Sequence, residues 1–198
     1  MSSRTPRKQR ADGARSRATI LRAAANLATI EGLEGITIGS LAEHIGMSKS
    51  GLYAHFGSKE ELQLATIATA AEILDAEVLT PAAAIEDPLE HLRSLCHTFL
   101  DYVERRVFPG GCFFVTVEVE FAAYPGAVRE TIQAFARGWI ERLEGLLREA
   151  GVADAEAVAF ELNAFMLLGN TGFVLHDDPV YLQRARAAID QRLLKLRA

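Results

Sequence analysis

Residues 37–56 have the sequence TIGSLAEHIGMSKSGLYAHF, and this stretch decides the fold. Thr37 is of a type that caps the start of a helix. The apolar side chains after it recur at the spacing of one helix face: Ile38, Leu41, Ala42 and Ile45. Gly46 tolerates the positive φ of a tight turn, and Ser48 can cap a second short helix. Two short helices joined in this way predict a helix-turn-helix.

The second helix of this pair divides its side chains by position. Lys49, Ser50 and Gly51 lie in its first turn, where a recognition helix touches the edges of DNA bases. Leu52 and Phe56, four residues apart, are expected to face inward and pack. The pattern therefore predicts a base-reading surface at residues 48–51 backed by an apolar face.

Three further side chains near this helix are candidates for contacts with DNA phosphates. Tyr53 and His55 are expected to point away from the packed side, toward a neighbouring phosphate. Lys59 stands at the start of the next helix, where a cation and free backbone amides can hold a phosphate together.

The charge of the chain is distributed unevenly. The formal net charge is −5, but residues 1–59 carry +5 and the remaining residues carry −10. An acidic total is therefore compatible with nucleic-acid binding at the N-terminal end.

Helical periodicity continues on both sides of the motif. The first helix has an apolar stripe from Ile20 to Ala28 and is expected to end at Gly32, a good C-terminal cap. Residues 113–123 are ambiguous, since valines alternate with polar residues as in a strand. We interpret them as a helix, because a lone strand would have no partner. The fold class is therefore all-α, and further helices are expected over residues 48–56, 58–79, 87–107, 126–150, 154–176 and 179–197.

Several classes of protein are disfavoured by composition and motif. With 198 residues, 49% of them hydrophobic, the chain suits one or two globular domains. No apolar run approaches the length that spans a membrane, and the basic N-terminus lacks the apolar part of a secretory signal, so a cytoplasmic location and no membrane partner are expected.

Catalysis and cofactor binding also lack a signal. The chain has no glycine-rich phosphate loop, no serine nucleophile elbow and no metal-binding histidine pair, so we expect no enzyme and no cofactor. Glu118 and Glu120 diverge around a helix and make a poor catalytic pair. A metal site from Cys96-His97 with Cys112 and His176 is disfavoured, because adjacent ligands point to different helix faces.

The next-to-last helix predicts a second copy of the chain as partner. Between residues 160 and 174 its apolar side chains occupy most of its circumference, and a helix apolar all round is buried all round. A partner chain would supply the missing cover, although an internal core helix of a monomer is the alternative. The residues expected at the dimer interface are Phe165, Gly169, Gly172, Phe173, Leu182 and Ile189.

Residues 17–62 resemble the N-terminal domain of the TetR family of transcriptional regulators. The resemblance rests on Ile20, Ala23, Ala24 and Leu27, on Gly32, Gly35 and Thr37, on Leu41-Ala42, on the run from Ile45 to Phe56, and on Ser58 to Leu62. It implies a homodimer whose recognition helices enter successive major grooves of a pseudo-palindromic operator. It also adds Thr37 and Ser40 as phosphate contacts and Ser48 as a residue of the DNA-binding surface.

The resemblance further implies a domain division and a ligand pocket. Residues 1–14 would be a basic flexible arm, 15–62 the DNA-binding domain with a linking helix to about 79, and 80–198 a ligand-binding and dimerisation domain. Apolar walls with few polar groups are typical of small-molecule sites, and an inward Glu118 could pair with a cationic ligand. The same residues also suit an ordinary core: Cys96, Phe99, Leu100, Val103, Phe114, Glu118, Phe121, Phe135, Trp139 and Phe165.

Together, these expectations predict that the protein is a cytoplasmic, nucleoid-associated repressor. A homodimer would bind double-stranded operator DNA, and an unidentified small-molecule effector would release it by favouring another conformer. An activator, or a regulator that senses redox state through Cys96 and Cys112, is the alternative within this class. The alternative from another class is a helical enzyme or small-molecule-binding protein whose helix-turn-helix no longer reads DNA.

Overall fold

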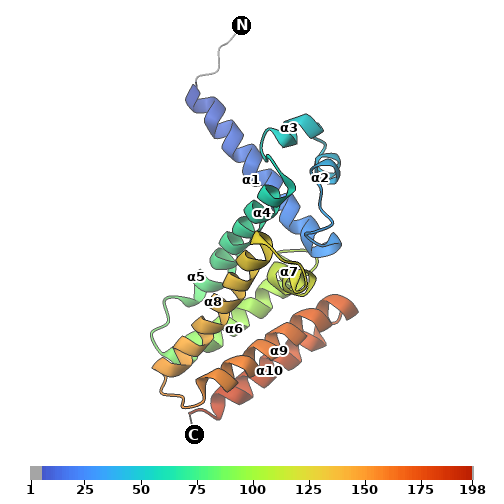
Figure 1. The fold of residues 1–198 in the computed structure, drawn as a ribbon. Coiled ribbons are helices and arrows are strands. Elements are labelled where there is room, and N and C mark those ends of the chain that lie inside the picture. The colour runs from blue at the N-terminus through green and yellow to red at the C-terminus, as the bar shows by residue number, and fades with distance from the viewer. Residues whose placement is uncertain (1–5, 198) are drawn as a thin grey trace.

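The secondary structure of the described residues is entirely helical, as the sequence predicts (Figure 1). The computed structural model describes the backbone of residues 6–197 and side chains from residue 16 onward. The helices are α1 (Pro6–Glu31), α2 (Ile38–His44), α3 (Lys49–Tyr53), α4 (Lys59–Leu74), a π-helical turn η1 (Asp75–Leu79), α5 (Thr80–Ala82), α6 (Pro88–Glu104), α7 (Phe113–Phe121), α8 (Ala127–Glu149), α9 (Ala155–His176) and α10 (Val180–Leu194).

Residues 16–56 of α1, α2 and α3 form one end of the molecule, which we call the head. Ile20 and Ala24 of α1, Leu41 of α2 and Leu52 of α3 are all buried against one another, together with Phe56. Figure 1 shows α2 and α3 at the upper end of the molecule and α9 and α10 at the opposite end. The apolar faces read from the sequence are therefore the ones that join the three helices.

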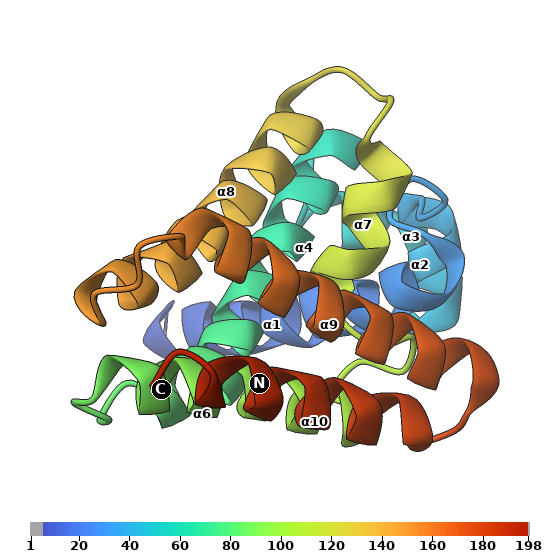
Figure 2. The same cartoon turned by 90° about the horizontal axis from the view of Figure 1, so that it is seen from below.

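Helices α6 to α10 form the rest of the molecule, which we call the body. Helix α9 packs between α8 and α10, and α6 contacts both α9 and α10. Figure 2 shows α9 and α10 running side by side. Helix α4 links the two parts, since it packs against α1 of the head and α8 of the body.

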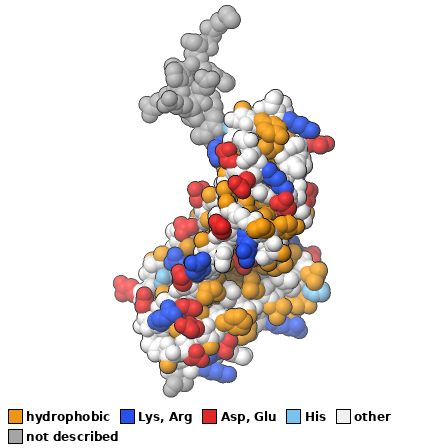
Figure 3. Space-filling view, viewed as in Figure 1, with side chains coloured by type: hydrophobic (Ala, Val, Ile, Leu, Met, Phe, Trp, Pro, Cys, Tyr) orange, Lys and Arg blue, Asp and Glu red, His pale blue; other side chains and the backbone are white. Residues whose placement is uncertain are grey.

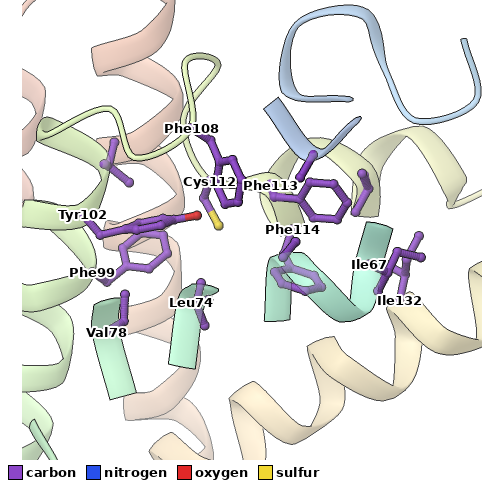
Figure 4. Packing of buried hydrophobic residues seen from close by; sticks show 14 of the residues in the cluster. Ile67, Leu74, Val78, Phe99, Tyr102, Phe108, Cys112, Phe113, Phe114 and Ile132 are labelled. Atoms are coloured by element: carbon purple, nitrogen blue, oxygen red, sulfur yellow. The ribbon is translucent and has the colours of Figure 1, made fainter. Parts of the chain in front are cut away.

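A run of aromatic rings crosses the centre of the molecule (Figure 4). Phe99, Tyr102, Phe108, Phe113 and Phe114 follow one another with ring centroids 5.3–6.1 Å apart. Such tilted and edge-on contacts stabilise a core beyond the area they bury. The run leads from the middle of α6 through the loop before α7 into α7 itself.

Several helix boundaries differ from the expected ones. Residues 6–14, expected in a flexible arm, belong to α1, which begins at Pro6; residues 1–5 lie outside the described residues. Helix α3 ends at Tyr53, not near Phe56, because Phe56 turns into the core. The helix after residue 58 loosens into η1 at Asp75 and ends at Ala82.

The expected dimer-interface residues are mostly buried within the single chain, so that prediction is wrong for them. Phe173, Leu182 and Ile189 are covered by the packing of α9 on α10. A Cβ atom at Gly172 would overlap the Tyr181 ring, and one at Gly169 would meet Ala185. The glycines therefore let α10 approach α9 within one subunit, and Phe165 is only partly buried, against the same core.

The outer face of α9 remains apolar and uncovered. Phe160, Leu168 and Leu175 are 73%, 67% and 74% exposed. Among the described residues, α9 is long and apolar enough to cross a membrane by length and composition alone, contrary to the expectation above. Core helices of soluble proteins pass the same test, so this is a weak sign.

Candidate nucleic-acid interface and ligand cavity

The turn between α2 and α3 has the geometry that the sequence predicts. Gly46 adopts a φ of +70°, where only glycine is free of strain. Ser48 caps α3, its side chain accepting a hydrogen bond from the Gly51 amide at 3.1 Å. Because Leu52 is fully buried, the opposite side of α3 faces outward.

That outward side carries the side chains expected to read DNA. Lys49, Ser50 and Tyr53 are exposed, Tyr53 by 58%, and Gly51 is half-buried beside them. The Lys49 side chain lies over Gly39, which brings the start of α2 close to this surface. The structure thus gathers one amine, one hydroxyl and one phenol at the exposed face of a short helix at the tip of the molecule.

Thr37 and Ser40 bond chiefly to each other. The Thr37 side chain accepts the Ser40 amide, and the Ser40 side chain accepts the Thr37 amide, both at 3.0 Å. This reciprocal pair satisfies two amides at the start of α2. These bonds between Thr37 and Ser40 therefore hold the start of α2 in place.

Of the residues expected at phosphates, His55 forms a bond within the protein through its backbone and Lys59 forms bonds through its side chain. The His55 carbonyl accepts a hydrogen bond from Arg17 at 3.2 Å, and the guanidinium of Arg17 lies over the Phe56 ring. The Lys59 ammonium donates to the Glu34 carbonyl and, at 2.7 Å, to the Glu34 carboxylate. That bond from Lys59, with a second from Gln63, holds the pKa of Glu34 below its ordinary value. Lys59 therefore fastens α4 to the turn after α1.

A cavity of about 120 Å³ lies in the body between α4, α6, α7, α8 and α9. Its walls are mostly apolar or aromatic, and the two amide- or carboxyl-bearing side chains among them are Glu118 and Asn163. The lining residues are Leu74, Phe99, Cys112, Phe114, Val115, Glu118, Phe135, Ala136, Trp139, Ile140, Asn163 and Leu167.

Only part of the expected pocket lines this cavity. Phe99, Phe114, Glu118, Phe135 and Trp139 do so. The other expected members do not line it: Cys96, Leu100, Val103, Phe121 and Phe165. Leu100 packs toward Gly169, and Phe121 lines a separate outer groove. The sequence shows that these residues are apolar, but not which neighbour each one meets.

Both cysteines are buried thiols. Burial raises the pKa of Cys96 to about 12 and that of Cys112 to about 11. Since the thiolate is the reactive form, neither side chain suits a redox sensor at neutral pH. Of the other residues weighed as metal ligands, His97 contacts Asp190 at 2.9 Å and His176 stacks on Tyr181.

Head and body meet at a set of contacts that the sequence did not indicate, which we call the junction. The Glu120 carboxylate of α7 accepts the backbone amides of Leu33 and Glu34, at 2.8 and 2.9 Å. The Arg22 side chain of α1 donates to the Val107 carbonyl at 2.6 Å. Helix α7 therefore contacts the ligand cavity through Glu118 and the head through Glu120.

A second part of the junction joins the loop before α7 to α1. The Gly110 amide donates to the Thr29 hydroxyl at 3.0 Å, and the Arg22 guanidinium lies over the Phe108 ring. Phe108 belongs to the aromatic run that reaches Phe99 at the cavity. Packed rings thus connect the cavity wall to the first helix of the head.

Two family descriptions match most of the chain. "Bacterial regulatory proteins, tetR family" matches residues 20–66, and "Tetracyclin repressor-like, C-terminal domain" matches residues 88–189. A relative, the nucleoid occlusion factor SlmA of Marinobacter nauticus, is 30% identical over 134 residues. That alignment covers 68% of this chain but 65% of SlmA, less than two thirds of its length.

Solved structures show the same fold. A TetR transcriptional regulator from Chloroflexus aurantiacus is 24% identical with a TM-score of 0.84, covering 92% of this chain and 96% of that one. The regulator PfmR from Thermus thermophilus is 29% identical with a TM-score of 0.65, covering 88% and 96%. AibR, solved in complex with isovaleryl coenzyme A and operator DNA, is 26% identical with a TM-score of 0.67, covering 78% and 86%.

Proposed function

The chain belongs to the TetR family of bacterial transcriptional regulators, and on this premise we propose that it is a homodimeric repressor that a small-molecule ligand releases from a pseudo-palindromic operator. The observation that carries the proposal is helix α7, which contacts the ligand cavity and the DNA-reading head at once. The protein would act in the cytoplasm on chromosomal DNA.

The exposed face of α3 supports the DNA-reading part of the proposal. Lys49, Ser50 and the backbone at Gly51 would contact bases, while Tyr53 and His55 would contact phosphates. A lysine amine and a serine hydroxyl can bond to base edges in the major groove. Thr37, Ser40 and Lys59 would act mainly by holding α2 and α4 in the required position.

The outer face of α9 supports the homodimer. Ala157, Phe160, Ala164 and Leu168 are exposed and follow one another at three- and four-residue spacing, and Leu175, also exposed, lies two turns further along the helix. Figure 3 shows hydrophobic side chains at the surface of the lower half of the molecule, where Figure 1 places α9. A contiguous exposed apolar face of this kind marks an interaction surface. A second copy would cover it and would present two recognition helices together.

The junction supports release by a ligand. A ligand acts only by binding one conformer more tightly than another. If occupation of the cavity favours a different position of α7, Glu120 moves with it and shifts the turn at residues 33–34 of the head. AibR, solved in complex with isovaleryl coenzyme A and operator DNA, is a neighbour that binds both a small molecule and DNA.

A gel shift on the DNA upstream of the chain's own gene, across a salt series and against random duplex, tests DNA reading. Specific binding should weaken steeply with salt, because phosphate contacts release counterions. Lys49→Ala should reduce the preference for specific DNA by about tenfold. Lys195→Ala removes the same charge at the far end of the chain and should change nothing. Equal binding to both duplexes would favour the alternative of a helix-turn-helix that no longer reads DNA.

Sedimentation at micromolar concentration tests the dimer. Leu168→Glu places a charge in the centre of the α9 face and should convert a dimer to a monomer. Val119→Glu is the matched control, because Val119 of α7 is 79% exposed but lies outside that face. A monomeric wild type, or equal effects of the two variants, would contradict the homodimer.

A further inference from the structure

The Glu118 carboxylate is the one acidic group on the wall of the ligand cavity. No hydrogen bond or ion pair joins it to another described residue. Burial raises the pKa of Glu118 above its ordinary value, and no neighbouring charge contributes to that shift. A partly desolvated carboxylate without a partner costs free energy in the empty protein, and a matching group on a ligand would recover it.

The other polar wall group, Asn163, has its acceptor atom occupied. The Asn163 side-chain oxygen accepts a hydrogen bond from the Trp139 indole at 3.1 Å. The rest of the cavity wall around Glu118 is apolar or aromatic and includes the stacked rings of Phe114 and Phe135. Aromatic faces attract cations, so ring walls with one carboxylate suit a positive charge and repel a negative one.

Glu118 stands where the cavity meets the surface. It also lines an outer groove of about 210 Å³ between α7 and α8, together with Phe121, Arg129 and Ile132. Arg129 is exposed and forms no ion pair with Glu118. A ligand could therefore place its charged group at Glu118 and its apolar group in the cavity, entering from the groove.

The size of the cavity limits the apolar group. An engineered cavity of about 150 Å³ holds benzene, so 120 Å³ suits one small ring or a short branched chain. Resting on the proposed function of this cavity as the effector site, we propose that the effector is an organic cation, a small aromatic or aliphatic amine whose ammonium pairs with Glu118.

The sole tryptophan of the chain makes the proposal measurable, because Trp139 lines the cavity and its fluorescence reports occupation. Three probes share one phenyl group and differ in charge: 2-phenylethylamine, 2-phenylethanol and 3-phenylpropionate. At neutral pH the amine should quench Trp139 with at least about tenfold higher affinity than the alcohol, and the propionate should bind most weakly.

The variant Glu118→Gln keeps the shape of the side chain but removes its charge. It should abolish the preference for the amine, so that the affinities for amine and alcohol lie within about threefold of each other. Glu130→Gln makes the same change at an exposed carboxylate of α8 that lines neither the cavity nor the groove, and it should preserve the preference for the amine. Circular dichroism tests whether each variant folds. If a variant does not fold, the affinities of the three probes for the wild-type protein still decide the proposal.

Three results would overturn the proposal: equal binding of amine and alcohol, tightest binding of the propionate, or no quenching by any probe up to about 10 mM. A gel shift on the same samples separates this failure from failure of the proposed function. Intact specific DNA binding with no cation preference would reject the effector class alone, whereas loss of specific DNA binding would reject the regulator.

Discussion

Helix α7 carries two carboxylates, two residues apart, with opposite surroundings. Glu120 faces the head and accepts two backbone amides, whereas Glu118 faces the cavity and has no partner. The paired carboxylate fixes the position of α7 against the head. The unpaired carboxylate of Glu118 can still form a bond with a ligand. The cavity side of α7 is therefore suited to respond to a ligand, and the head side to transmit the response.

The largest expected effect comes from breaking the junction at Gly110. A Cβ atom there would overlap the backbone carbonyl of Thr29, which is part of a packed helix and cannot move aside. Gly110→Ala should therefore lower the unfolding free energy by about 3–5 kcal/mol, seen as a fall in Tm of roughly 10 °C.

Gly138→Ala is the matched control for this change. The space around Gly138 of α8 is open, so the added methyl group should raise helix stability by about 0.5–1 kcal/mol. Similar Tm values for the two alanine variants would show that the head and body are not in contact at Gly110.

The next effect separates the two carboxylates of α7. Glu120→Ala leaves two backbone amides without an acceptor and should lower the unfolding free energy by about 2 kcal/mol, or Tm by roughly 5 °C. Glu118→Ala, the same change two residues earlier, should not lower Tm. Equal losses in thermal unfolding would mean that Glu120 has no special role at the junction.

A smaller effect concerns the paired carboxylate of Glu34. Lys59→Ala and Glu34→Ala should each lower Tm by about 2–3 °C, since the pair is partly exposed to solvent, and the double variant should lose little more than either. Additive losses would contradict the pairing. A loss of DNA affinity in the lysine variant alone would support the phosphate contact that the sequence predicts for Lys59.

The smallest effect depends on pH. Because burial raises the pKa of Glu118 in the folded chain, its ionised form destabilises the fold at neutral pH, and that cost disappears as pH falls toward the ordinary pKa of glutamate. Glu118→Gln should thus raise Tm by about 1–2 °C at neutral pH and leave it unchanged near pH 4. A benefit that grows in acid would contradict the direction of the shift.

The sequence predicts the head better than the body for a physical reason. Gly46, Ser48 and the face at Leu52 are specified by neighbours a few residues away, through turn geometry, capping and helical period. The roles of Glu120, Lys59 and Gly169 depend on residues from distant helices that no local pattern names. The sequence predicts that an apolar side chain such as Leu100 is buried. Which residue it contacts depends on how α6 packs against α9.

The same limit explains the dimer prediction. Helix α9 is apolar on two sides, as its sequence indicates, but the pattern does not tell which side α10 covers. The glycines proved to face α10 within the chain, and the exposed stripe with Phe160, Leu168 and Leu175 is the other side.

Selection from a pool of random DNA duplexes, each longer than two helical turns, tests the central claim most directly. A homodimer that reads DNA through α3 should enrich a pseudo-palindrome whose half-sites lie about one helical turn or slightly more apart. Lys49→Ala should weaken or alter that motif. Recovery of no motif, or of a single unpaired half-site, would contradict the account of a dimeric, operator-reading regulator.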